Sequence, residues 1–241
     1  MIADEPCYDL DELAQANWHV HGFYSGCTEM TLPNLVADAE AAGLHTLAVT
    51  DHHGVAAEPE DIDGFVSALR EEFKGIETNV RFLFGGELSS IAPGVFIDSL
   101  ETNARMDYRL YATTHYHLGL WGQPEDRSPR GYAKHALATV RALIPTGRAD
   151  CIAHPFQMDT KASAAVTDRE LAEVLELGKK HGVAWGINTQ WVCSDPDFSR
   201  RLWGMGREIG VTFRMGTDAH ERRHIDPKPF LPALHALFDD A

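Results

Sequence analysis

The stretch HTLAVTDH, residues 45–52, joins a run of β-forming residues to a polar Asp-His pair. The same unit recurs along the chain: a short β-rich run, a polar residue, and then a segment with helical spacing. The predicted strands span residues 17–21, 45–50, 82–87, 108–115, 150–154, 184–188 and 211–217. Strands that alternate with helices are typical of a mostly parallel sheet with right-handed crossovers.

The segments between these strands carry helix start and stop signals. Thr167 and Glu170 have the spacing of a capping box, and Gly182 marks the end of the same helix. Other predicted helices span residues 31–43, 133–144 and 195–210. Closing the sheet would give a TIM-like barrel, whereas an open sheet would be doubly wound.

The length and composition favour one domain. The chain has 241 residues, of which 44% are hydrophobic, enough to bury one sizeable core. It has no linker rich in Gly, Ser or Pro, so we expect a single domain over residues 1–241. The loop 118–131 is the longest irregular stretch, and long loops on barrels often cover sites.

The charge and the N-terminal sequence exclude several classes of protein. The net charge of −15 disfavours an extended nucleic-acid surface, although a pocket for a small phosphate stays possible. Residues 1–11 lack the pattern of a signal peptide, and no apolar run is long enough to span a bilayer. The four cysteines form no close pairs, which favours a reduced, cytoplasmic protein.

Metal-binding residue types fall at or just after six of the seven predicted strands. The carboxyl ends of barrel strands converge on one mouth, where barrel active sites lie. This position favours the closed barrel over the open sheet. The residues are His19, His21, Asp51, His52, Glu87, His115, His154, Asp218 and His220.

Each of these residues also has an ordinary structural interpretation. A lone buried histidine more often packs in a core than binds a metal, and an Asp-His pair can cap the next helix. Recurrence at the same structural position argues against these alternatives. The remaining histidines are scattered and resemble surface or packing residues: His45, His135, His181, His224 and His235.

The ordered motifs are HVH at 19–21, TDH at 50–52, GE at 86–87, His115, HP at 154–155 and GTDAH at 216–220. In this order they resemble the PHP (polymerase and histidinol phosphatase) superfamily, over residues 17–227. The INT motif at 187–189 and the closing GTDAH look most like histidinol-phosphate phosphatases. The resemblance implies a distorted (β/α)7 TIM-like barrel.

The resemblance also implies two or three divalent metal ions. His19, His21, Glu87 and Asp218 would hold the first. Glu87 would bridge to a second ion, completed by His115 and His154. His52 and His220 would hold a third. Such nitrogen and oxygen ligands suit Zn, Mn or Fe.

The sequence departs from the family pattern at two places. Relatives usually supply a further ligand soon after the HVH motif, where this chain offers only Cys27. Cys27 is as well explained as a small buried residue. Histidinol-phosphate phosphatases commonly carry a basic residue beyond the INT motif, where this chain has Gln190, Trp191, Val192 and Cys193. Trp191 therefore suggests a more apolar pocket wall.

The implied chemistry is hydrolysis, because adjacent divalent ions would turn a bridging water into hydroxide at neutral pH. His117, His53 and Asp51 lie beside presumed ligands and are the candidate catalytic residues. His117 is favoured as the general acid, although it could equally orient a ligand. Candidate phosphate-binding residues are Arg105, Arg127, Arg130 and Lys161, with Trp191 as a wall of the substrate pocket.

Three functions follow in order of preference. The first is a phosphoesterase acting on a small phosphorylated metabolite. The second is metal-assisted hydrolysis of a non-phosphate substrate such as an ester or an amide. The third is a metal-binding module without catalysis that docks on a partner such as a polymerase. The complete ligand set argues against this third function.

Overall fold

The computed structural model describes residues 5–53, 62–157 and 162–239. Its strands are β1 (Ala16–Val20), β2 (Thr46–His52), β3 (Arg81–Ala92), β4 (Val95–Phe96), β5 (Tyr108–Ala112), β6 (Cys151–Ile152), β7 (Ala184–Asn188) and β8 (Phe213–Gly216). Its α-helices are α1 (Leu10–Leu13), α2 (Leu32–Ala41), α3 (Ile62–Phe73), α4 (Leu100–Ala104), α5 (Pro129–Leu143), α6 (Ala162–Ala165), α7 (Asp168–His181), α8 (Thr189–Ser194), α9 (Pro196–Ile209) and α10 (Leu231–Phe238).

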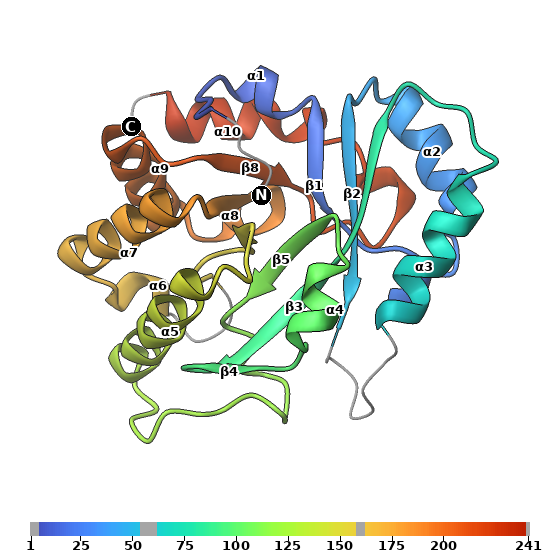
Figure 1. The fold of residues 1–241 in the computed structure, drawn as a ribbon. Helices are drawn as coiled ribbons and strands as arrows, with labels where there is room; N and C mark the ends of the chain where they lie inside the picture. Colours follow the sequence, from blue (N-terminus) through green and yellow to red (C-terminus); the bar gives the residue numbers. More distant parts are fainter. Residues whose placement is uncertain (1–4, 54–61, 158–161, 240–241) are drawn as a thin grey trace.

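Seven strands form a parallel sheet in the order β1-β2-β3-β5-β6-β7-β8. The two ends of this sheet meet: the backbone N–H of His21 donates to the Ala219 carbonyl, and that of Asp218 donates to the His19 carbonyl, both at 2.9 Å. An isolated parallel bridge joins Val20 to Ala219. The sheet is thus nearly closed into a barrel surrounded by helices, which confirms the predicted α/β TIM-like fold (Figure 1).

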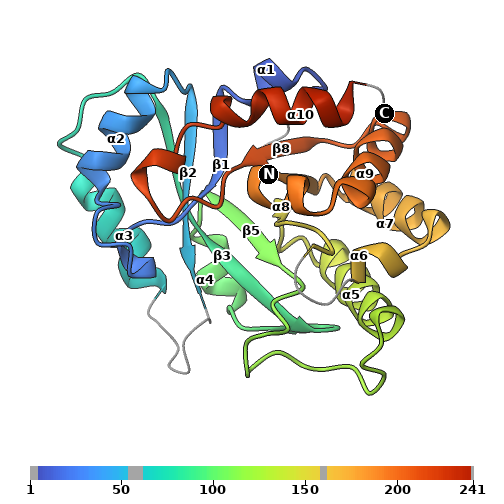
Figure 2. The ribbon, with the colours of Figure 1, turned by 180° about the vertical axis from the view of Figure 1, so that it is seen from behind.

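Two apolar layers hold this barrel together. Alternate strand residues such as Leu47 and Val49 pack outward against the helices. Figure 2 shows those helices from behind, with α2 and α3 beside β2 and α5, α7 and α9 around the later strands. Ala48, which lies between these two residues in the sequence, belongs to a second, separate cluster with Trp18 and Tyr108. Because successive residues of a strand point to opposite faces, this second cluster lies inside the barrel.

Some strand limits differ from those predicted. β3 extends beyond Glu87 to Ala92 and then folds back as an antiparallel hairpin with β4. Glu87 therefore lies inside a strand, where it pairs with Leu110 of β5. β5 ends at Ala112, so His115 lies on the segment beyond it. β3 can continue because its residues stay paired with β5 as far as Ser89.

Helix ends follow their local chemistry. Thr167 and Glu170 make both bonds of the predicted capping box, and Gly182 closes α7 with φ 68°. α5 starts earlier than predicted, because the Ser128 hydroxyl accepts the N–H of Gly131 as an N-cap. Among the helices that the structure describes, none is long and apolar enough to cross a membrane.

Candidate metal centre

Eight predicted ligand residues come together at the mouth formed by the carboxyl ends of the barrel strands. Their nitrogen and oxygen atoms form four overlapping groups, and within each group the atoms lie within 4.8 Å of one another. The groups are His19, His21 and Glu87; His19, His154 and Asp218; Glu87, His115 and His154; and His21, His52 and His220.

The carboxylate of Glu87 connects these groups. Its Oε1 lies 2.9 Å from Nε2 of His154 and 3.7 Å from Nε2 of both His115 and His19. Its Oε2 lies 3.0 Å from Nδ1 of His52. The two oxygens thus face different sets of histidines, as expected of a carboxylate shared between neighbouring metal positions.

Asp218, on the loop after β8, contacts both histidines of the HVH motif. Its Oδ1 lies 2.9 Å from Nε2 of His21 and 3.4 Å from Nε2 of His19. Its Oδ2 accepts a hydrogen bond of 3.2 Å from the side-chain amide of Asn188. Asn188 also caps α8 through its Oδ1, so one residue connects a presumed ligand to the helix that carries Trp191.

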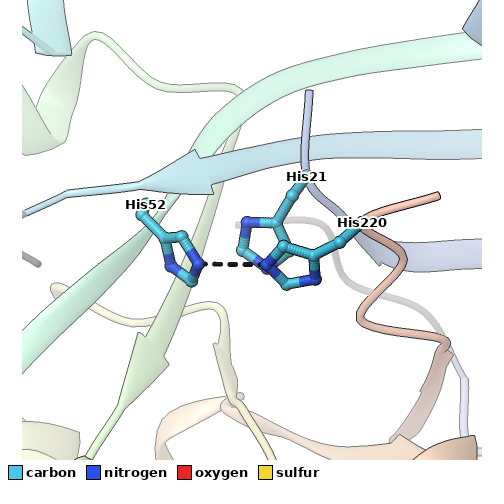
Figure 3. A group of neighbouring side chains, drawn as sticks. All are labelled: His21, His52 and His220. Carbon is cyan, nitrogen blue, oxygen red and sulfur yellow. Dashed lines mark hydrogen bonds between the residues drawn. The ribbon is translucent and has the colours of Figure 1, made fainter. Parts of the chain in front are cut away.

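Three histidines form the outer group of the centre: His21 directly after β1, His52 at the end of β2 and His220 on the loop after β8 (Figure 3). The ring of His21 lies 4.0 Å from that of His52 and 4.1 Å from that of His220, measured between centroids. Nε2 of His52 lies 3.2 Å from Nε2 of His220. His21 therefore contacts the pair that the family resemblance assigns to a third ion.

Burial and charge set the protonation of these groups. Burial lowers the pKa of His115 to about 4 and that of His21 to about 3, so both rings are neutral at pH 7. Burial alone would raise the pKa of Glu87, but His19 and His115 bring it well below its usual range. Asp218 behaves in the same way beside His19 and His21. Burial alone would lower the pKa of His19 and of His52, but Glu87 and Asp218 raise both above the ordinary value, so an ion would have to displace a proton there. The ionised carboxylates and the neutral rings of His21 and His115 are already in the state that binds metals.

These residues fit divalent metal ions. Nε2 of His19 lies 3.0 Å from Nε2 of His21, and a single proton can satisfy at most one such contact between two nitrogens. His19, His21 and Glu87 are each at most 3% exposed, so water offers little compensation. Without a cation, the nitrogen and oxygen lone pairs that face one another here repel. A cation between them would remove this repulsion, and imidazole with carboxylate suits Zn, Mn and Fe.

The backbone of the centre is strained at two presumed ligands. His154 has φ 25° and Asp218 has φ 53°, which are left-handed values that non-glycine residues rarely adopt. Such conformations cost about 1–3 kcal/mol each and cluster at functional sites. Here they follow the strand ends at which both side chains turn toward the mouth.

The candidate catalytic residues occupy different environments. His117 is exposed, and its ring centroid lies 5.5 Å from that of His115. His53 is buried beyond β2, and its backbone N–H donates to the Glu87 carbonyl. Asp51 is fully buried, and its Oδ1 accepts bonds from the turn that follows β1. The structure thus brings only His117 to the accessible side of the centre among these three.

Two of the candidate substrate-binding residues, Trp191 and Arg127, lie at the centre or on the loop that borders it. The Trp191 ring lies 6.4 Å from that of His154, at the centre. Arg127 donates to Gln123 on the loop before α5, and Trp121 of this loop lies 5.4 Å from the His115 ring. The loop therefore borders the centre and carries one cation.

Two other candidate cations, Arg105 and Arg130, are paired with carboxylates. Arg105 bonds to Glu101 and lies in the short connection between α4 and β5, so it is at the amino end of the strands, opposite the mouth. Arg130 pairs with Glu170 through two bonds of 2.6 and 2.7 Å and lowers the pKa of that carboxyl to about 2. Lys161 lies outside the described residues.

Cys27 belongs to none of the potential metal groups among the described residues. It is half-buried and packs against the outer apolar layer. The residue that approaches the histidines from this turn is Ser25, whose Oγ lies 3.3 Å from Nδ1 of His21. A search for metal-ligand types overlooks Ser25, because a hydroxyl acts here on a ligand and not on the ion.

Comparisons with known proteins agree with this fold. No protein-family model matches the chain. A protein of Vibrio parahaemolyticus serotype O3:K6, described as a probable phosphatase, is 27% identical over 216 residues, covering 84% of this chain and 76% of the relative. The crystal structure of a histidinol phosphate phosphatase from Lactococcus lactis, complexed with zinc, L-histidinol and phosphate, superposes with a TM-score of 0.58 at 15% identity. That superposition covers 90% of this chain and 92% of the other, so this chain shares the fold of that phosphatase.

Proposed function

We propose that this chain is a metal-dependent phosphoesterase of the PHP type that hydrolyses a small phosphorylated metabolite. The observation that carries this proposal is the buried Glu87 carboxylate, whose two oxygens face separate sets of histidines. The relative described as a probable phosphatase supports the same reaction class. The solved zinc-containing histidinol phosphate phosphatase supports the choice of a phosphate ester.

Two neighbouring ions would share Glu87. His19, His21 and Asp218 would complete one position, and His115 and His154 the other. Divalent ions in such a pair lower the pKa of coordinated water and neutralise charge on substrate oxygens. We propose zinc, manganese or iron for these positions, because the ligands are imidazole and carboxylate. His52 and His220, with His21, offer a third position.

The protein groups around the ions have distinct roles in this proposal. Glu87 and Asp218 offset the charge of the ions, and the buried rings of His115 and His154 exclude water from one side. His117 is placed to donate a proton to the leaving-group oxygen, since it is exposed beside His115. Arg127 is the described cation best placed to approach the substrate phosphate, on the loop that packs Trp121 against His115.

We also propose a small, soluble-phase substrate in a reducing compartment such as the cytoplasm. The net charge of −15 opposes binding of a nucleic-acid backbone. All four cysteines are free thiols, which suits reducing conditions.

Hydrolysis of a non-phosphate ester or amide is the second candidate. Trp191 favours it, because an indole 6.4 Å from His154 gives the centre an apolar wall where related phosphatases are expected to be basic. Such a wall would accommodate an uncharged acyl or alkyl group.

A substrate panel on metal-loaded protein separates the two candidates. We expect hydrolysis of a chromogenic phosphate monoester, stimulated by Mn or Zn and abolished by a chelator. Histidinol phosphate should react no faster than other small phosphates, because Trp191 and Cys193 occupy the region where a basic residue is expected. A fully metallated sample that cleaves carboxylic esters or amides and no phosphate ester would favour the second candidate.

A further inference from the structure

The turn after β1 is held by one buried carboxylate. Oδ1 of Asp51 accepts the backbone N–H of Gly22 at 2.7 Å, the backbone N–H of Ser25 at 2.9 Å and the Ser25 hydroxyl at 2.5 Å. Asp51 is 0% exposed. A side chain at position 22 would place its Cβ 2.9 Å from Oδ2 of Asp51, so glycine permits the close approach.

The Ser25 hydroxyl meets two further groups. Its Oγ accepts the backbone N–H of His52 at 2.9 Å. It also lies 3.3 Å from Nδ1 of His21. The hydroxyl therefore connects the ends of β1 and β2 at the residues that carry two of the presumed metal ligands.

The number of protons available decides the direction of these bonds. A serine hydroxyl has one donor and two acceptor lone pairs. Its donor is used by Asp51, and one lone pair is used by the backbone of His52. Only the second lone pair is left for His21, so the Ser25 contact requires a proton on Nδ1 of His21. Oδ1 of Asp218, 2.9 Å from Nε2, competes for that proton when no ion lies between them. With Nδ1 protonated, Nε2 would offer its lone pair to an ion held together with Asp218 and His19.

We propose that Asp51 and Ser25 form a hydrogen-bonded relay that favours the Nδ1-protonated tautomer of His21 and orients its ring for metal binding. Both are positioning residues, because neither contacts the centre except through His21 and His52. Outer hydrogen bonds of this kind raise the basicity of a ligating histidine and hold its ring in place. The proposal rests on the metal-ligand part of the proposed function.

The relay also changes the role expected of Asp51. Its position beside His52 in the TDH motif suggests a catalytic carboxylate, yet its bonded oxygen is directed at the turn. Ser25 in turn stands in the segment where relatives are expected to supply a further metal ligand. Its hydroxyl is fully used by protein groups, so it is not available to an ion.

The test begins with the metal-free protein. Long-range proton–nitrogen NMR correlations of ¹⁵N-labelled protein should show a population of His21 protonated at Nδ1, in competition with the Nε2-protonated form that Asp218 favours. In Ser25→Ala we expect the population to move toward the Nε2-protonated form, which free histidine prefers. Wild-type protein with no detectable Nδ1-protonated His21, or with the same tautomer populations as Ser25→Ala, would overturn the relay.

Zinc affinity, measured by competition with a chromogenic chelator, provides the second readout. Ser25→Ala should lose about 10- to 100-fold in affinity, the range for outer-shell partners, and Ser25→Thr should restore most of it. Ser99→Ala is the matched control, because Ser99 caps the distant helix α4 and touches none of these groups. Equal zinc affinity in wild type and Ser25→Ala, with an unchanged tautomer, would refute the relay. Absence of phosphatase activity would count against the proposed function only, since neither readout needs a substrate.

Discussion

Glu87 is the residue on which the proposed chemistry depends most. It is 2% exposed and lies within 3.0 Å of His52 through one oxygen and 2.9 Å of His154 through the other. Glu87→Gln keeps the shape of the side chain but removes its charge. We expect phosphatase activity to fall by more than about 100-fold, beyond the range for outer-shell partners.

The control for this substitution is His45→Gln. His45 is exposed, precedes β2 at the amino end of the strands, and contacts its neighbour Thr46. Activity measured on the chromogenic monoester should stay within about twofold of wild type, as for most surface changes away from a site. An equal loss of activity in the two variants would contradict the assignment of Glu87 as a shared metal ligand.

Individual residues also show which parts of the site are predictable. His154 and Asp218 are predicted as ligands because of their residue type and their position after a strand, and the structure places both in groups that could hold a metal ion. Ser25 could not, since its role depends on Asp51, which is 26 positions away in sequence and bonds to it only in the folded chain. Arg105 seemed a plausible phosphate binder from its charge, but β5 carries it to the opposite end of the barrel.

At the scale of elements, β8 and β1 must approach closely to place the HVH and GTDAH motifs together. A Cβ at Gly216 would lie 2.6 Å from Cβ of His19 and 3.2 Å from its backbone nitrogen. Gly216→Ala should therefore push β8 from β1 and displace His19. We expect a loss of about 1–3 kcal/mol in the free energy of unfolding, typical of overpacking, with weaker zinc binding.

Gly75→Ala is a matched control, because a Cβ there has no neighbour within 4 Å. Urea unfolding and chelator competition on both variants give the comparison. Equal stability and equal zinc affinity in the two proteins would mean that the contact between Gly216 and His19 does not position the ligand.

Elements differ in how well their limits follow from the sequence. The ends of α7 were predictable because Thr167, Glu170 and Gly182 act through bonds within a few residues. The length of β3 was not, since residues beyond Glu87 stay extended only by pairing with β5 and β4. Local signals thus fix caps, whereas strand ends depend on distant partners.

At the scale of the whole molecule, the parallel order of seven strands brings potential ligands from distant parts of the sequence to one mouth. The alternation of strands and helices predicts this order, and the ligand positions favour closure. The manner of closure, through the backbone of His19, His21 and Ala219, is set by tertiary contact between β1 and the loop after β8.

The metal content of the purified, reconstituted protein tests the central claim most directly. Glu87 is shared between two groups of potential ligands, and His21, His52 and His220 offer a third. Elemental analysis should therefore find about two to three transition-metal ions per chain, since complete sites of this type fill readily. Less than about half an ion per chain after reconstitution would contradict the account, because folded sites with a full ligand set retain their metal.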